Sequence, residues 1–436
     1  MVLLTSKAQI LIIVSLLTLP LGLLTLRMEV ILFSLIILIS IALDVIYFTH
    51  SIREVEVNAW RDRIPERVIV DSIIPVKVYV KIKGFRGIVS VHDHVPDVFQ
   101  ITEGRTSLYT RVHENQVIKL EYVFKAVVRG DHRIGPLTVI LHSPLGLVGK
   151  RIDLPKNTIN YIKVVPQFYA YRFKTREAIA RYIMPPGGHP VRMRGLGVDL
   201  EYIRNYLPGD DVRKIAWKVS AKNPRRELMV KETSSEVRLS LFIVLDAGIE
   251  SSLGYPRRLI DYYVEAAGSL ILAALDHGDL VGLYISGTPS LLVPLTRRKE
   301  YLYMALKFLE TLNPSNTRSI LHRVPSVLAS ALPRRSIVFY FSSLENIIDV
   351  KGIAEKTRAL GHKPVFMIPY TPSFIRISVD KLPLKYFYNK VLIDEINRLK
   401  QVVNELVAAE AEVVILKPVD FVSKALKIYY SLRELA

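Results

Sequence analysis

The spacing of apolar residues divides this chain into stretches of different character, and the first is continuously apolar. Two runs, Ala8–Leu26 and Val30–Phe48, contain one charged residue between them, Asp44. Each run has 19 residues, enough for a helix to cross a hydrocarbon layer of roughly 30 Å. A cleaved signal peptide has a single, shorter apolar region. The pattern therefore predicts a transmembrane helical hairpin over residues 1–51.

The charges around the two runs predict their orientation. Both flanks of a hairpin lie on one side of the membrane, and they carry Lys7, Arg53, Arg61, Arg63 and Arg67, against Arg27 in the turn. Because basic flanks stay inside, we expect an integral protein of the plasma membrane with its soluble part in the cytoplasm. Asp44 lies near the end of the second run. Its side chain reaches either the interface or a polar group of the other helix.

Residues 52–166 have an apolar period close to two. Strands are expected at Val68–Val70, Val76–Ile82, Val117–Phe124 and Leu137–Leu141, separated by glycine and proline turns. Short strands at this spacing predict an antiparallel β-sandwich of the immunoglobulin-like kind.

A His-Asp-His sequence falls on a probable strand of this region. Alternation puts His92 and His94 on one face, an arrangement that metal sites use. Asp97 is the one nearby candidate for a third ligand, so we expect these histidines to be exposed surface residues.

Residues 237–436 alternate apolar strands with helical stretches. Strands are expected at Leu239–Leu245, Leu280–Ser286, Leu291–Leu295, Ile337–Phe341, Pro364–Ile368 and Val413–Leu416. Helices are expected at Leu259–Leu275, Lys299–Leu312, Ile320–Leu332, Ile348–Leu360, Leu392–Ala409 and Phe421–Leu435. Such alternation predicts a doubly wound α/β domain with a largely parallel sheet. Its ligand crevice would lie at the carboxyl ends of the strands, beside Asp246 and Ser342-Ser343.

Composition narrows the classes of site. The chain has no cysteine, which excludes disulfides, thiol nucleophiles and thiolate metal centres. It has 59 Lys and Arg residues against 41 Asp and Glu residues, a net charge of +18. Much of this excess falls in residues 167–236, predicted to be a basic linker. For a membrane-tethered chain we expect anionic headgroups or an acidic partner there rather than nucleic acid.

The most distinctive segment of the linker is Gly197–Trp217. Pro208-Gly209-Asp210-Asp211 predicts a turn in which glycine takes a positive φ and an aspartate caps the helical turn from Val212. Arg204 and Arg213 are placed to pair with the two aspartates, with Trp217 packed beneath. Such a cluster is either a charged clamp or a docking or acid–base surface.

This segment resembles the signature of the "domain of unknown function 58" family. The matching residues are Gly197, Asp199, Arg204, Tyr206, Gly209, Asp210, Asp211, Arg213 and Trp217. The resemblance implies a C-terminal domain similar to a von Willebrand factor A domain. It also implies association with MoxR-type AAA+ ATPases, which act in the maturation of other complexes.

A von Willebrand factor A domain binds a divalent cation through Asp-x-Ser-x-Ser, a threonine and a later aspartate. Here Asp246 matches the first position, Gly248 and Glu250 replace the two serines, and Ser251 follows. Thr317 corresponds to the threonine, and Ser343 stands where the aspartate is expected. The site is either a Mg²⁺ site using Asp246, Glu250 and Thr317 or a partner-binding face that needs no ion.

We therefore expect a membrane-anchored scaffold whose α/β domain binds a protein partner. The partner implied by the resemblance is a MoxR-type ATPase or the complex that it matures. No nucleophile, nucleotide-binding or metalloprotease motif stands out, so we expect no enzyme activity. The alternatives are a metal-dependent hydrolase at Asp246 and Glu250, and an envelope adhesion protein with the soluble part outside.

Overall fold

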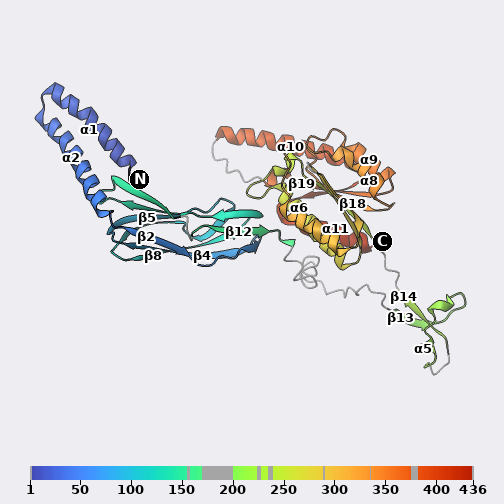
Figure 1. Cartoon of the computed structure of the whole chain (residues 1–436). Helices are drawn as coiled ribbons and strands as arrows, with labels where there is room; N and C mark the ends of the chain where they lie inside the picture. Colours follow the sequence, from blue (N-terminus) through green and yellow to red (C-terminus); the bar gives the residue numbers. More distant parts are fainter. Residues whose placement is uncertain are drawn as a thin grey trace. The chain divides into compact units, whose positions relative to one another are not determined.

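The chain forms two compact units in the computed structural model, Met1–Gln167 and Phe168–Ala436 (Figure 1). The structure describes residues 2–154, 158–168, 200–222, 227–233, 239–287, 290–333, 335–374 and 382–434. Gly197 and Asp199 of the signature lie outside these ranges. The finer division at residues 51, 166 and 236 stays a prediction.

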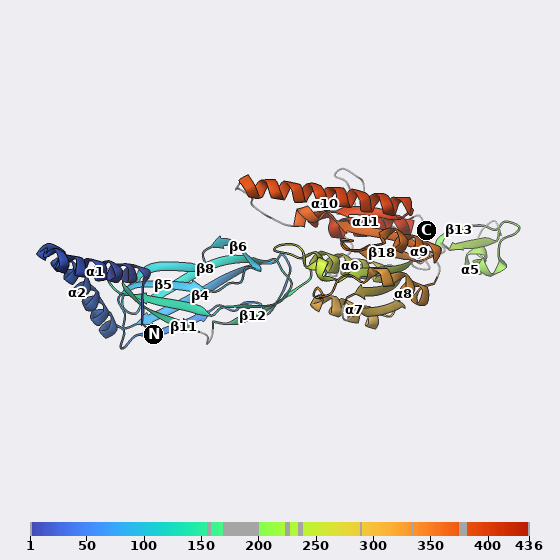
Figure 2. The ribbon, with the colours of Figure 1, turned by 90° about the horizontal axis from the view of Figure 1, so that it is seen from above.

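The first unit begins with the predicted helical hairpin. Helices α1 (Ser6–Thr25) and α2 (Met28–Ser51) are long and apolar enough to cross a membrane. Two polar contacts join them: Ser15 Oγ donates to the Ser34 carbonyl at 3.0 Å, and the Thr18 and Ser34 hydroxyls lie 2.7 Å apart. Small polar residues of this kind hold apolar helices together without water. Both ribbon views show α1 and α2 side by side (Figures 1 and 2).

The rest of this unit consists of short strands. They are β1 (Val2–Leu4), β2 (Glu56–Arg61), β3 (Arg67–Ile69), β4 (Ile73–Lys83), β5 (Gly87–Asp93), β6 (Phe99–Gly104), β7 (Ser107–Val112), β8 (Val117–Ala126), β9 (Gly130–Ile134), β10 (Leu137–His142), β11 (Val148–Leu154) and β12 (Asn160–Val165). Two sheets are antiparallel, in the orders β1-β11-β10-β5-β7 and β2-β4-β8-β6. A third has the order β3-β12-β9, with β3 parallel to β12.

The two larger sheets share one apolar core. In β4 the side chains of Val76, Val78 and Val80 are buried, and in β5 those of Val89 and Val91 are buried in the same cluster. The buried and exposed positions of β4 alternate because successive side chains of a strand point to opposite faces. The predicted antiparallel β-architecture is therefore confirmed.

The His-Asp-His sequence lies at the end of β5. His92 and His94 are exposed, as expected, whereas Asp93 between them is buried. The Asp93 carboxylate accepts from Arg61 Nη2 at 2.5 Å and from the Tyr122 hydroxyl at 2.7 Å. Asp93, the central residue of this sequence, therefore links the two larger sheets by hydrogen bonds and is not part of a metal site.

The predicted hydrogen bond between Asp44 and the other helix was wrong, and its position at the membrane interface stays a prediction. The side chain neither reaches solvent nor bonds the other helix; it is buried against the turn between β10 and β11. Its Oδ2 accepts from Ser143 Oγ at 2.6 Å, and its Oδ1 accepts from the Leu145 backbone N–H at 3.3 Å. The sequence pattern could not reveal this partner because it lies 99 residues away along the chain.

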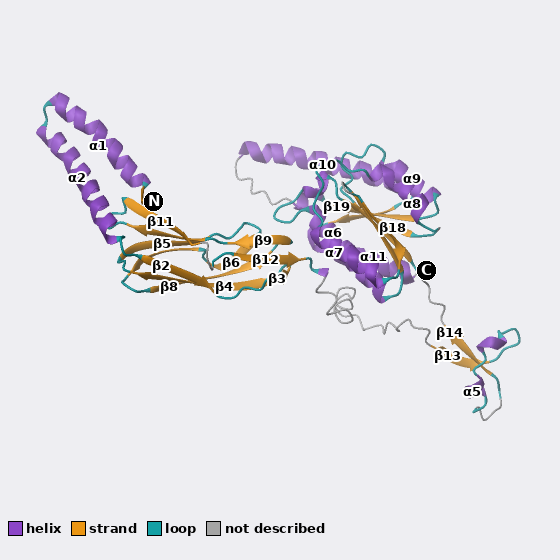
Figure 3. Ribbon diagram, in the orientation of Figure 1, coloured by secondary structure: helices purple, strands orange, loops and turns teal. Residues whose placement is uncertain are grey.

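The second unit contains a six-stranded sheet in the order β17-β16-β15-β18-β19-β20. The strands are β15 (Ser240–Asp246), β16 (Leu280–Ser286), β17 (Leu291–Thr296), β18 (Ile337–Phe341), β19 (Lys363–Pro369) and β20 (Glu412–Leu416). Every neighbouring pair is parallel except β16 and β17. The helices are α6 (Leu259–Asp276), α7 (Lys299–Thr311), α8 (Val324–Ala331), α9 (Val350–Ala359), α10 (Leu382–Ala408) and α11 (Phe421–Glu434). Figure 3 shows this strand and helix alternation, which confirms the predicted α/β class.

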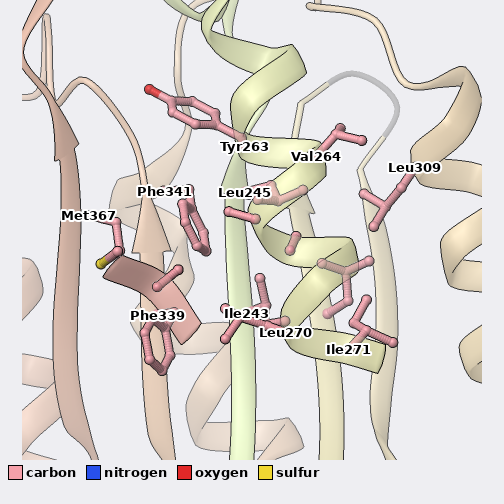
Figure 4. Packing of buried hydrophobic residues seen from close by; sticks show 14 of the residues in the cluster. Ile243, Leu245, Tyr263, Val264, Leu270, Ile271, Leu309, Phe339, Phe341 and Met367 are labelled. Carbon is pink, nitrogen blue, oxygen red and sulfur yellow. The ribbon is translucent and has the colours of Figure 1, made fainter. Parts of the chain in front are cut away.

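Both faces of this sheet are covered. On β15, Ile243 and Leu245 pack with residues of α6, α7 and α11, whereas Phe242 and Val244 pack with residues of α8, α9 and α10. Figure 4 shows the first of these clusters, where Tyr263 of α6 lies near Phe341. Because β15 is buried on both faces, its sequence reads as an unbroken apolar run. That run ends at Asp246.

A small hairpin precedes the sheet in the sequence. Strands β13 (Leu200–Asn205) and β14 (Met229–Thr233) pair antiparallel, with a short helical turn (Val212–Lys214) and α5 (Trp217–Ser220) between them. This region was predicted to be a linker, and the hairpin within it was missed.

Candidate functional site

The strand order places Asp246 where ligands bind in doubly wound sheets. β15 is followed in the sequence by β16 on one side, and its other neighbour, β18, comes later. The connections therefore diverge between the carboxyl ends of β15 and β18, the position at which doubly wound sheets have their ligand crevice. Asp246 ends β15, and Ser342 directly follows β18. Ser342 Oγ donates to Asp246 Oδ2 at 2.6 Å, so the two strand ends are joined at this point.

The Asp246 carboxylate is held by the protein on both oxygens. Its Oδ1 accepts from the Gly248 backbone N–H at 3.2 Å, while Oδ2 takes the Ser342 hydroxyl. Ser342 Oγ also accepts from the Leu344 N–H at 2.9 Å, which fixes the direction of the hydroxyl. Ser343, the residue singled out from the sequence, is buried, and its carbonyl lies 3.4 Å from both terminal nitrogens of Arg398. The hydroxyl that bonds to Asp246 therefore belongs to Ser342, one residue before the predicted Ser343.

Glu250 supplies a second buried carboxylate. It lies in the helical turn Ile249–Ser252 that follows β15, and Ser251 Oγ closes this turn by donating to the Gly248 carbonyl at 2.7 Å. Glu250 Oε1 accepts from Asn346 Nδ2 at 3.1 Å. Glu250 Oε2 is buried and has no hydrogen-bond donor among the described residues. A buried carboxylate oxygen without a donor costs free energy, so a group that donates a hydrogen bond to this atom would be stabilising.

Burial raises the pKa of Asp246 to about 6. The hydrogen bonds from Ser342 and Gly248 oppose this change, and the nearby negative charge of Glu250 adds to it. Burial also raises the pKa of Glu345, which follows β18 in the same loop. Carboxyl groups whose pKa is raised and which gather in a crevice are typical of functional sites.

Three other buried carboxylates of this chain have arginine partners. Asp93 pairs with Arg61 and Glu265 pairs with Arg257, each at 2.5 Å, and Asp279 pairs with Arg433. Within the described part of the chain, neither Asp246 nor Glu250 forms an ion pair with lysine or arginine. The crevice therefore holds two buried acidic groups that the fold has not neutralised.

The described side chains do not assemble the oxygen shell that Mg²⁺ prefers. Both Asp246 oxygens already accept protein donors, and the exposed Thr317 hydroxyl lies 2.6 Å from Ser315 Oγ. At Gly248 a Cβ would come within 2.7 Å of the Ser319 nitrogen, so a serine there would force the surrounding backbone to shift. Among the described residues, no three His, Asp or Glu side chains gather as a metal cluster. Mg²⁺ requires near-octahedral oxygen ligands, so this donor set fits an ion-free face better.

Sequence reasoning missed three exposed apolar residues in the loops at this edge of the sheet, here called the apolar rim. Ile249, Tyr255 and Ile348 are exposed, and they lie in the two loops that follow β15 and β18. The Glu250–Asn346 hydrogen bond joins these loops close to Ile249 and Ile348. Isolated apolar loop residues have no signal in a sequence, and only the strand order brings their two loops to the same edge of the sheet.

The signature residues form a turn at the end of the β13–β14 hairpin. Arg204 donates two hydrogen bonds to Asp210, each 2.7 Å long, and Asp211 caps the next turn by accepting from the Arg213 N–H at 3.0 Å. Gly209 has a φ of +111°, as the predicted turn requires. The Tyr206 N–H donates to the Leu228 carbonyl at 2.8 Å, which closes the hairpin.

The predicted position of Trp217 was wrong. Its side chain is 64% exposed rather than packed beneath the turn. Ile215 and Ala216 occupy the buried positions instead, because Ile215 bridges to Val230 and the Ala216 N–H donates to Met229. The hairpin therefore presents Trp217 on its surface, together with the exposed Leu207 and Val212.

A comparison with known families finds a match to the region that contains this hairpin and much of the parallel sheet. The model of a family described as "Protein of unknown function DUF58" matches residues 202–365. The "Uncharacterized protein YeaD" of Bacillus subtilis (strain 168) is 23% identical over 190 residues, which span 44% of each chain. The chain thus spans less than half the length of this relative.

Two solved structures resemble parts of the chain weakly. An aerotolerance-related membrane protein from Bacteroides fragilis NCTC 9343 has 16% identity and a TM-score of 0.30, over 45% of this chain and 99% of that one. The CARDB domain of the PF1109 protein from Pyrococcus furiosus has 15% identity and a TM-score of 0.18, over 26% and 89%. Residues 202–365, from the β13–β14 hairpin to β19, are the part of this chain that matches the DUF58 family.

Proposed function

We propose that this protein is a membrane-anchored scaffold that binds a protein partner at the carboxyl edge of its parallel sheet. One observation carries the proposal: Asp246 and Glu250 are buried together without a cationic partner among the described residues, and Glu250 Oε2 has no donor there. The two helices α1 and α2 support the anchor by their length and composition.

The chemistry of the crevice favours a partner that presents a basic side chain. A lysine or arginine would donate to Glu250 Oε2 and offset the negative charge that Glu250 places near Asp246. The exposed Ile249, Tyr255 and Ile348 would then exclude water around this contact. A central charged contact within an apolar ring is a common arrangement of binding energy at protein interfaces.

The family resemblance supplies a candidate partner, a MoxR-type AAA+ ATPase or the complex that it matures. The flanking basic residues favour a soluble part in the cytoplasm, where such an ATPase would meet it. Recognition in this proposal needs no catalytic step. The exposed surface of the hairpin around Trp217 is available as a second contact.

The test uses the full chain in lipid nanodiscs and a purified MoxR-type ATPase from the same organism. Removing one member of a buried charged contact costs about 2–5 kcal/mol, so Asp246→Asn and Glu250→Gln should each weaken binding by about 30-fold or more. Ile348→Asp should weaken it too, because it puts a charge into the apolar rim. Glu355→Gln is the matched control, since Glu355 is exposed on α9 and paired with Lys351.

Unchanged affinity in all three crevice variants would refute a docking role for this edge. Accessibility of a C-terminal tag separates the cytoplasmic scaffold from an envelope adhesion protein. Hydrolysis that depends on added metal and is lost in both carboxylate variants would instead favour the hydrolase alternative.

A further inference from the structure

The turn between β10 and β11 is fastened to both apolar helices. Asp44 of α2 accepts from Ser143 and from the Leu145 N–H, as described above. Thr5, which caps α1, donates from Oγ1 to the Gly146 carbonyl at 2.9 Å, and β1 pairs with β11 directly before it. The turn 143–147 therefore has a fixed height along the helices.

The helical rise gives that height. Asp44 follows Met28 by 16 residues, or roughly 24 Å, and α1 has 20 residues, or roughly 30 Å, beyond Thr5. The hydrocarbon core of a bilayer is roughly 30 Å thick. If the loop between the helices lies at one surface of the bilayer, the turn 143–147 lies where the hydrocarbon meets the headgroups of the other.

The side chains at this height suit that boundary. Leu145 is exposed at the tip of the turn, and Ile46 and Tyr47 are exposed on α2 just beyond Asp44. Tyrosine is enriched where a membrane meets water, because its ring is apolar and its hydroxyl is polar. An exposed leucine next to an apolar helix continues the lipid-facing surface.

Basic residues surround the apolar tip. Strand register puts Gly149 opposite His142, His142 opposite Ile88, and Ile88 opposite Arg111, so the segments at this end of the sheet are neighbours. The segments 5–7, 52–54, 84–88, 111–116 and 142–150 contain Lys7, Arg53, Arg86, Arg111 and Lys150 but only Glu54 and Glu114 as acidic residues. A positive surface next to a bilayer attracts anionic headgroups.

We propose that this end of the first unit is a lipid-binding face, on which Leu145 enters the interface and the surrounding arginines and lysines bind anionic phospholipid headgroups. The inference rests on the membrane anchor of the proposed function. Because Asp44 and Thr5 fix the turn, the β-strands would be held against the bilayer rather than on a loose tether.

The natural absence of cysteine makes this face easy to probe. Leu145→Cys, Ile36→Cys and Arg105→Cys are each labelled with an environment-sensitive fluorophore, and the full chain is placed in nanodiscs with spin-labelled lipids. Ile36 is exposed in the middle of α2. Arg105 marks the far end, because its neighbour Thr106 bonds to Asp93, at the opposite end of β5 from Ile88.

We expect the Leu145 probe to be quenched by spin labels near the headgroup, the Ile36 probe by deep labels, and the Arg105 probe by neither. Adding phosphatidylserine to phosphatidylcholine should increase quenching at residue 145, and Arg86→Gln with Arg111→Gln should abolish that increase. A Leu145 probe as water-exposed as the Arg105 probe, with Ile36 quenched, would overturn the lipid-binding face and leave the anchor intact. An unquenched Ile36 probe would overturn the anchor itself.

Discussion

Replacing Asp246 by asparagine should change how the stability of the parallel sheet depends on pH. The carboxyl group is buried at the end of β15 and its pKa is about 6, whereas 3.8 is its ordinary value. Asparagine has nearly the same size and keeps an oxygen that can accept from Ser342. The substitution therefore removes the titration with little change in packing.

The direction in which the free energy of unfolding changes with pH follows from the number of protons that each state binds. Between pH 3.8 and about 6 the native state binds more protons than the unfolded state, because its pKa is the higher of the two. The free energy of unfolding of the natural protein should therefore fall as pH rises through this window and level off above it. A difference of about two pKa units corresponds to about 3 kcal/mol. At neutral pH this loss in the free energy of unfolding is complete.

Hydrogen exchange of the β15 and β18 amides, followed by mass spectrometry on the full chain, measures the local free energy of opening. Between about pH 4 and pH 7 that free energy should fall by about 3 kcal/mol more in the natural protein than in Asp246→Asn. Glu355→Gln, on exposed α9, should follow the natural protein. Equal pH profiles for the natural protein and Asp246→Asn would refute a raised pKa at this carboxyl group.

Other predictions address the metal site and the hairpin. Gly248→Ser restores the residue of the metal-binding pattern, yet it should lower stability by about 1–3 kcal/mol in thermal unfolding, because its Cβ would meet the Ser319 nitrogen. Calorimetric titration with Mg²⁺ should give no saturable heat, and binding that Asp246→Ala abolishes would contradict the ion-free face. Arg204→Lys should increase hydrogen exchange in β13, since lysine cannot form the paired bonds to Asp210.

The sequence predicted the fold where a single physical signal dominates. The apolar run ending at Asp246 could only be a strand buried on both faces, and the run from Ala8 could only be a long apolar helix. The β13–β14 hairpin was missed because its basic composition is also typical of a linker. In the structure Arg204 bonds to Asp210 and stabilises the turn. Trp217 is exposed because its neighbour Ile215 forms the bridge to Val230. The periodicity of the sequence does not reveal this long-range pairing.

The candidate site, too, could be predicted only in part from the sequence. Asp246 could be placed at the carboxyl edge from the pattern of strands, because that edge is set by topology. Its partner, Ser342 rather than Ser343, depends on where β18 ends, a matter of a single residue. What the structure adds is the contrast among buried acids. The fold supplies arginines to Asp93, Glu265 and Asp279 but none, among the described residues, to Asp246 and Glu250. Asp44 is also buried without an arginine, but Ser143 and the Leu145 N–H donate to its two oxygens, whereas Glu250 Oε2 has no donor among the described residues. It is at this oxygen that we propose a basic side chain of the partner to bind.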